Sequence, residues 1–94
     1  MPFQIFEACY NTSMSKIWLN GEFVESEDAQ VSVFDHGLLY GDGCFEGIRV
    51  YNNRIFKLRS HLKRMFESAQ AIRLQPGCSI DELEEIVRET VQVN

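Results

Sequence analysis

The sequence lacks long apolar runs, clustered basic residues and a secretory leader, and each absence excludes a class of protein. No apolar run approaches the roughly 20 residues that a transmembrane helix needs. The opening MPFQIFEACY has no basic region and too short an apolar core for a signal peptide, so we expect a cytoplasmic protein with no membrane partner. The net charge of −5 argues against nucleic acid, because phosphate-backbone binding needs clustered Lys and Arg. A single anion, such as a cofactor phosphate, needs only one or two local donors, so the composition is compatible with a ligand of this kind.

Paired cysteines are also lacking, because Cys9, Cys44 and Cys78 are odd in number and have no metal-type spacing. We interpret them as free thiols in a reducing compartment. The 94 residues, 45% hydrophobic and 24% charged, suit one small globular domain. No repeats and no low-complexity linkers interrupt the chain.

What is present in excess is glycine within one short stretch. The segment 31–50, VSVFDHGLLYGDGCFEGIRV, holds four of the six glycines between two apolar, strand-like runs. Glycine is used where the backbone turns tightly or must approach another group closely. A hairpin follows, and then a helix that begins near His61 and Arg64. A glycine-punctuated loop, a strand and a cationic helix in this order are typical of a site for a small anionic ligand.

Turn residues and alternation predict the elements of the first two thirds of the chain. Asn20-Gly21 favours a type I′ hairpin over 17–24, and Asn52-Asn53 favours a second tight turn. Alternating apolar residues predict strands at 30–33, 44–51 and 55–58, with one helical turn at 37–40.

Helical spacing replaces alternation near residue 60. One face collects Leu62, Met65, Phe66, Ala69 and Ile72, which predicts a helix over 60–72. Ser79 and Glu82 form a capping box that opens a second helix with Leu83, Ile86, Val87 and Val91 on its apolar face. The fold expected is α+β: a small antiparallel-rich sheet built from hairpins, packed with two C-terminal helices.

The segment YGDGCFEGIR, followed by RIFKLRSHLKRM, resembles the class IV (fold type IV) pyridoxal-phosphate aminotransferases, and most closely the branched-chain amino acid aminotransferases. The resemblance covers residues 17–94 in unbroken order. It implies that 14–94 is the N-terminal small domain of a D-amino acid aminotransferase-like fold, without the large catalytic domain. Residues 1–13 match nothing in the family. We interpret them as an upstream extension, such as a misplaced start codon would produce; the alternative is an extra N-terminal strand.

The resemblance also implies roles for individual residues. Arg64, the Arg of His-x-x-Arg, would hold the phosphate of pyridoxal 5′-phosphate; from spacing alone it would be a surface arginine. Phe45 and Gly47 would line the substrate pocket, with Arg49 close to it. Tyr40 would reach the active site of a neighbouring subunit, which makes a homodimer or higher oligomer part of the catalytic unit; its alternative is a half-buried loop tyrosine.

The residues themselves support part of this assignment. Phe45, Gly47 and Arg49 alternate along one strand and so share a face, which suits an apolar side chain beside a carboxylate. Core packing explains Phe45 alone equally well. Glu46 faces the other way and is expected to brace neighbouring backbone. His61 is expected to orient the start of its helix.

The implied activity is transfer of an amino group between Leu, Ile or Val and 2-oxoglutarate. The family's Schiff-base lysine lies outside this chain, because Lys16, Lys57 and Lys63 do not match it, so no catalytic residue is assigned and these 94 residues alone are expected to be inactive. The alternatives are the small domain of a D-amino acid aminotransferase or of an aminodeoxychorismate lyase, or a non-enzymatic dimerisation or binding module derived from it.

Other constellations are weaker. Gly41 to Gly47 has one residue too many for the dinucleotide motif G-x-G-x-x-G, and a strand rather than a helix follows. Asp35, His36, Asp42 and Cys44 are too mixed in hardness and spacing for a metal site, so none is predicted. Cys44 with His36 lacks the third group that would orient a thiol nucleophile.

Overall fold

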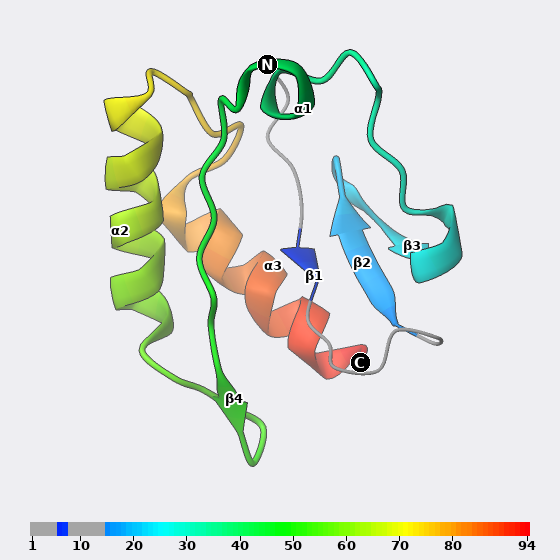
Figure 1. Cartoon of the computed structure of the whole chain (residues 1–94). Helices are drawn as coiled ribbons and strands as arrows, with labels where there is room; N and C mark the ends of the chain where they lie inside the picture. Colours follow the sequence, from blue (N-terminus) through cyan, green and yellow to red (C-terminus); the bar gives the residue numbers. More distant parts are fainter. Residues whose placement is uncertain (1–5, 8–14) are drawn as a thin grey trace.

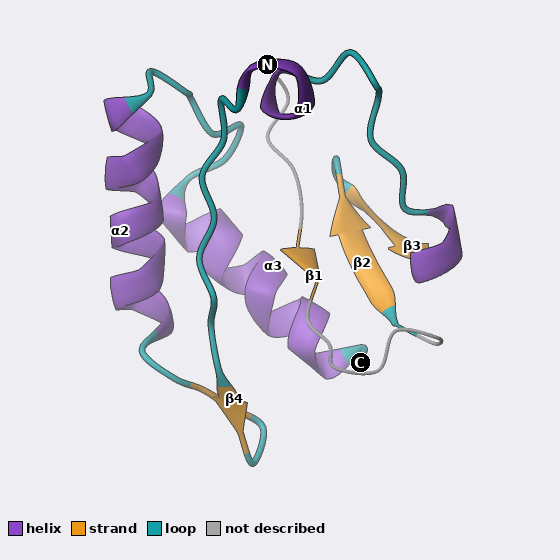
Figure 2. Cartoon of the chain, viewed as in Figure 1, coloured by secondary structure: helices purple, strands orange, loops and turns teal. Residues whose placement is uncertain are grey.

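The computed structural model describes residues 6–7 and 15–94 and confirms the α+β prediction (Figures 1 and 2). It contains a three-stranded sheet, a separate two-stranded hairpin and two long helices. The elements in chain order are β1 (Phe6–Glu7), β2 (Lys16–Leu19), β3 (Glu22–Glu25), a 3₁₀ turn (Ser26–Asp28), α1 (His36–Tyr40), β4 (Val50–Tyr51), β5 (Arg54–Ile55), α2 (Leu58–Ala71) and α3 (Ile80–Gln92).

The first hairpin forms where Asn-Gly predicted it. Strand β2 pairs antiparallel with β3, and Trp18 lies opposite Phe23. Asn20 and Gly21 have φ of 51° and 96°, the positive values that a type I′ turn requires at both central positions. Strand β1 pairs antiparallel with the other edge of β2, so the sheet order is β1-β2-β3. Two residues of the stretch 1–13 are therefore in a strand; the rest of that stretch lies outside the described residues.

The strand predicted over 30–33 is wrong. Residues 29–32 have no regular structure, and a turn follows in which the amide of Asp35 donates to the carbonyl of Ser32. Val31 and Val33 are exposed. Alternation stabilises a strand only when a neighbouring strand supplies hydrogen bonds and a surface to cover the apolar face. The described part of the chain offers this segment neither. The helical turn predicted next is confirmed as α1, which Asp35 caps and Gly41 ends with φ of 75°.

The strand predicted over 44–51 is only partly formed. Val50 and Tyr51 pair with β5, whereas residues 41–49 have no regular structure. The strand-like alternation nevertheless survives: residues 44, 46, 48 and 50 are partly buried, and residues 45, 47, 49 and 51 are exposed. The inner side chains Cys44 and Ile48 pack against the core. This segment thus has a buried side and an open side.

The second turn is confirmed, since Asn52 and Asn53 have φ of 48° and 63°. The strand after it is shorter than predicted, because β5 ends at Ile55. Lys57 adopts a left-handed conformation (φ 51°) and Leu58 already begins α2. Leu58 therefore packs as a helical residue in the core, not as a strand residue.

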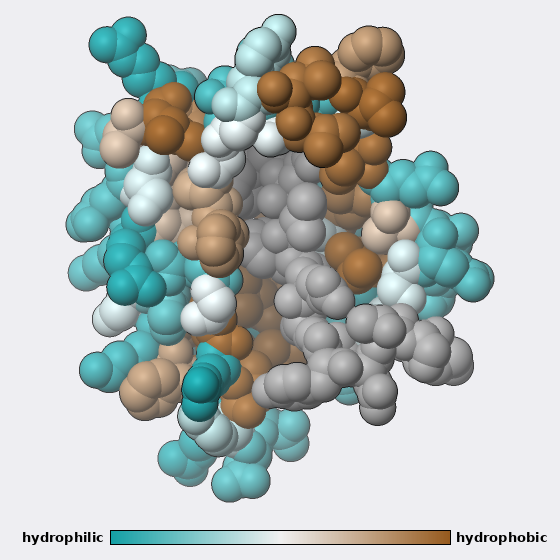
Figure 3. Space-filling model, viewed as in Figure 1, coloured by the Kyte–Doolittle hydropathy of each residue, from teal (hydrophilic) through white to brown (hydrophobic). Residues whose placement is uncertain are grey.

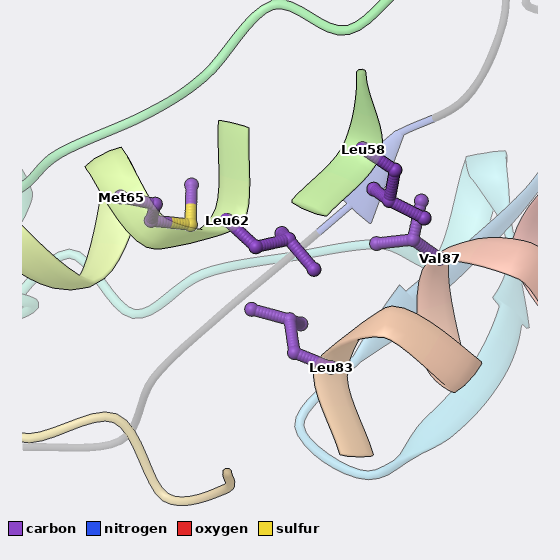
Figure 4. Close-up of a cluster of buried hydrophobic side chains, with 5 residues drawn as sticks. All are labelled: Leu58, Leu62, Met65, Leu83 and Val87. Carbon is purple, nitrogen blue, oxygen red and sulfur yellow. The ribbon is translucent and has the colours of Figure 1, made fainter. Parts of the chain in front are cut away.

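The core lies between α2 and α3. Leu58, Leu62 and Met65 of α2 point toward Leu83 and Val87 of α3, and Leu62 and Leu83 are fully buried (Figure 4). The predicted helical faces are confirmed for Leu62 and Met65 of α2 and for Leu83 and Val87 of α3. Ile72, predicted on the same face, lies just past the end of α2 and is exposed.

Helix α3 begins at the predicted capping box. The Ser79 hydroxyl accepts from the Glu82 amide at 3.1 Å, and the Glu82 carboxylate accepts from the Ser79 amide at 3.1 Å. The helix packs against α2 and also contacts β1 and β2, so it separates α2 from the sheet (Figure 1). Within the described residues, no helix has both the length and the apolarity to cross a membrane.

Replacing Leu62 with alanine is expected to lower the free energy of unfolding by about 2–5 kcal/mol, because it leaves a cavity between α2 and α3. Urea unfolding of the full-length gene product, followed by circular dichroism, measures the change. Lys63→Ala, at the next and exposed position, is the control and is expected to change stability by less than about 0.5 kcal/mol. Equal effects of the two substitutions would contradict the described core.

Candidate active site

The site is built from one face of α2 and the inner side of segment 41–49. His61 and Arg64 lie three residues apart on α2 and therefore share a face. The alternation of segment 41–49 points Glu46 toward that face, and its side chain is only 6% exposed. The fold thus brings Glu46 to two polar side chains that lie 15 and 18 residues further along the chain.

The Glu46 carboxylate binds both α2 side chains. Arg64 donates through Nε to Glu46 Oε2 at 2.8 Å and through Nη2 to Glu46 Oε1 at 2.6 Å, a bidentate ion pair. His61 Nδ1 lies 2.6 Å from the same Oε1. Glu46 was expected to brace backbone. That prediction is wrong, because its hydrogen-bond partners are side chains on α2.

These contacts fix the charge of the carboxylate. Hydrogen bonds from Arg64, and then from His61, lower the pKa of Glu46 to about 2, against the opposing effect of burial. The hydrogen bonds that Arg64 donates to Glu46 raise the pKa of Arg64 in turn. Both groups are therefore ionised at neutral pH, and the buried carboxylate has the partners that a buried charge requires.

Arg64 keeps donors for a further ligand. A guanidinium has five N–H groups, and Glu46 occupies one on Nε and one on Nη2. Among the described residues nothing else binds Arg64, and its side chain is 65% exposed. The end formed by Nη1 and Nη2 is thus open to solvent. Two parallel donors at that end match two oxygens of a phosphate or carboxylate.

The outer side of segment 41–49 carries the predicted substrate residues. Phe45 is 90% exposed, so the core-packing interpretation of Phe45 is wrong. A Cβ added at Gly47 would meet no atom within 4 Å, so the space beside this glycine is open. Arg49 donates from Nη1 to the hydroxyl of Tyr51 at 3.0 Å. Tyr51 was missed in the sequence, although its spacing of two residues from Arg49 places both on one side.

Tyr40 is exposed at the end of α1, and its ring packs against that of His36 at 5.1 Å between centroids. The half-buried loop position considered for it is wrong. The contacts of the structure join Glu46, His61 and Arg64 into one cluster. They do not link Tyr40 to that cluster.

The metal set and the thiol nucleophile considered in the sequence can be compared with the contacts of their residues. Within the described residues no group of three or more Asp, Glu, His or Cys side chains could hold a metal. Asp35 instead accepts from the amide of Gly37 at 2.9 Å. Burial raises the pKa of the Cys44 thiol, the opposite of what activates a nucleophile. Cys44 and Cys78 are free thiols; Cys9 lies outside the described residues.

The amino-acid sequence was also compared with known proteins and protein families. The family model for Amino-transferase class IV matches residues 43–94, which include all three members of the cluster. A putative branched-chain-amino-acid aminotransferase of Methanocaldococcus jannaschii is 51% identical over 79 residues, covering 84% of this chain and 27% of that protein.

D-alanine aminotransferases are also similar. The protein of Staphylococcus haemolyticus is 41% identical and that of Staphylococcus aureus 46% identical, each over 81 residues that cover 86% of this chain and 29% of the relative. The chain therefore spans between a quarter and a third of the length of the relatives it matches. The match of the family model over more than half of the sequence shows that this chain belongs to the class IV aminotransferase family.

Proposed function

We propose that the chain is the N-terminal small-domain part, residues 14–94, of a pyridoxal-phosphate-dependent branched-chain amino acid aminotransferase. In this proposal it moves an amino group between Leu, Ile or Val and 2-oxoglutarate, together with a large domain that supplies the catalytic lysine. The observation that carries the proposal is Arg64, which Glu46 holds on one edge and which is open to solvent at its other end. Phe45 and Gly47, on the outer side of segment 41–49, add an exposed face for a substrate. The higher identity to the putative branched-chain-amino-acid aminotransferase of Methanocaldococcus jannaschii supports the substrate class.

Arg64 suits the cofactor phosphate. Its open end offers parallel donors, and its charge is maintained at neutral pH. When bound, pyridoxal phosphate supplies the electron sink for amino-group transfer, and the protein supplies orientation and phosphate anchoring. In this chain Arg64 performs the anchoring. The chemical step itself belongs to residues beyond this segment.

The outer face suits the substrate. Phe45 presents an exposed aromatic ring for an aliphatic side chain, and Gly47 leaves space next to it. Arg49 lies on the same side and contributes a positive charge near a substrate carboxylate, with its guanidinium held by Tyr51. Burial of a leucine side chain against Phe45 requires a second wall, which we assign to the large domain.

Exposed apolar residues support a need for partner surfaces. Figure 3 shows hydrophobic side chains gathered over α1 and the segment that precedes it. The exposed apolar residues of this region are Val31, Val33, Phe34, Leu38, Leu39 and Tyr40. Patches of this kind mark interaction sites. We propose that the large domain and a second subunit cover them, with Tyr40 reaching the neighbouring active site, in a cytoplasmic homo-oligomer.

A D-amino acid aminotransferase is the second candidate, because D-alanine aminotransferases match over a similar share of the chain. The exposed Phe45 favours larger aliphatic substrates, whereas alanine offers only a methyl group to bury. A non-enzymatic binding module is the third. It would be favoured if the full-length gene product contained no further lysine-bearing domain and remained a folded, cofactor-free protein in light scattering.

Replacing Arg64 with alanine in the full-length gene product is expected to weaken pyridoxal-phosphate binding roughly 10- to 100-fold, because hydrogen bonds to charged groups contribute about 1.5–3 kcal/mol. Equilibrium dialysis and the visible, borohydride-sensitive absorbance band measure the affinity. Arg88→Ala is the control, since Arg88 is also an exposed helical arginine paired with a glutamate. Unchanged affinity in the Arg64 variant would remove the proposed phosphate site.

Replacing Phe45 with alanine is expected to lower kcat/KM for L-leucine by about tenfold or more and to change that for alanine little, because buried apolar contact contributes roughly 0.8 kcal/mol per CH₂. Steady-state rates with L-leucine, L-alanine and D-alanine, each with 2-oxoglutarate, measure the effect. A wild-type enzyme that prefers D-alanine to L-leucine would instead establish the D-amino acid candidate.

A further inference from the structure

Glu46 is an unusual carboxylate within this chain. Among the ion-paired carboxylates of the described residues it is the least exposed, at 6%, while the carboxylate with the next lowest exposure, Glu84, is 22% exposed. Withdrawing a carboxylate from water is unfavourable unless hydrogen bonds compensate for the lost hydration. Here all three compensating contacts come from α2, on the face that carries Arg64.

The geometry of the ion pair divides the guanidinium into two ends. Nε and Nη2 form its lateral edge, which Glu46 occupies with two hydrogen bonds of 2.8 and 2.6 Å. A planar guanidinium held at two atoms cannot rotate freely about its last bonds. The other end, formed by Nη1 and Nη2, is thereby held in one direction, toward solvent. Rotational freedom of Arg64 is lost before any ligand arrives.

We propose that Glu46 is a positioning residue for the oxyanion site at Arg64. It holds the lateral edge of the guanidinium, and the opposite end is thereby presented to the phosphate of the cofactor. Glu46 itself does not contact the phosphate. This inference rests on the proposed function of Arg64 and adds the residue that orders it.

Two effects of Glu46 on phosphate binding oppose each other. Its negative charge repels a phosphate, and its hydrogen bonds order the arginine that attracts it. Coulomb energy falls with distance, and the whole guanidinium separates the carboxylate from the open end. Immobilising a long side chain in advance removes an entropic cost that would otherwise oppose binding. We therefore expect the ordering effect to dominate.

The test is a double-mutant cycle in the full-length gene product, with Glu46→Gln, Arg64→Ala and the double variant. The measured quantity is the Kd of pyridoxal phosphate by equilibrium dialysis. In the presence of Arg64, Glu46→Gln is expected to raise Kd about three- to tenfold, because one rotamer-rich side chain is no longer ordered. In the Arg64→Ala background it is expected to have no further effect.

Three measurements distinguish positioning from a structural role. Pyridoxal without the phosphate is expected to bind Glu46→Gln and the wild type equally. Glu84→Gln, which removes a carboxylate that binds Arg59 and Arg88, is the matched control and should leave Kd unchanged. Thermal unfolding verifies that each variant is folded. Where Glu46→Gln does not fold, Glu46→Asp, which keeps the charge but shortens the side chain, replaces it in the same cycle with the same expectation.

The outcomes distinguish failure of the positioning role of Glu46 from failure of the proposed phosphate-binding role of Arg64. An equal rise in Kd in both backgrounds, or no rise in the presence of Arg64, would overturn the positioning role of Glu46. If Arg64→Ala left the Kd of pyridoxal phosphate unchanged, the proposed function of Arg64 would be overturned instead. A rise confined to the background with Arg64 would establish the positioning role.

Discussion

The packing of α2 against α3 is the constraint on which the rest of the structure depends. Leu62 and Leu83 are fully buried against each other's helices, and Cys44 and Ile48 of the extended segment pack onto the same cluster. Segment 41–49 has few backbone hydrogen bonds of its own, so its path along α2 is set by these inner side chains. Without the helix pair, nothing would bring Glu46 within hydrogen-bond distance of His61 and Arg64.

The ion pair between Glu46 and Arg64 then fixes the orientation of a side chain that helix packing has brought into position. Apolar contact is non-directional and tolerates rotation of a side chain, whereas two hydrogen bonds from one guanidinium to one carboxylate define both a plane and an orientation. Helix packing brings the segment and α2 together, and the pair of Glu46 with Arg64 orients the one exposed cation of the cluster. Local order at Arg64 is therefore a consequence of the core that lies beneath it.

Sequence predicted the features that local chemistry determines. Positive φ at Asn20-Gly21 and the capping box at Ser79 depend on residues within a few positions, and the structure confirms both. The strand over 30–33 was wrong because strand formation depends on a partner that the pattern does not contain. For the same reason the segment 44–51 keeps its alternation but has ladder hydrogen bonds only at Val50–Tyr51.

The candidate site shows the same division. Alternation correctly placed Phe45, Gly47 and Arg49 on one side and Glu46 on the other. The partners of Glu46 lie 15 and 18 residues away on α2, and only tertiary packing decides which residues of a helix meet the inner side of a strand-like segment. An isolated glutamate between apolar inner neighbours was the available signal, since a carboxylate on a buried side requires cationic partners.

This alternation assigns packing against the core and the surface open to a ligand to different residues. Residues 44, 46 and 48 determine packing and the orientation of Arg64, while residues 45, 47 and 49 face outward and make little contact with the core. A substitution at an outer position therefore changes the surface offered to a ligand with little effect on folding or on Arg64. A scaffold of this kind is suited to a family whose members include a putative branched-chain-amino-acid aminotransferase and D-alanine aminotransferases. Under the proposed function, the cluster of Glu46, His61 and Arg64 can remain fixed on the inner side, while the residues proposed to face the substrate vary on the outer side.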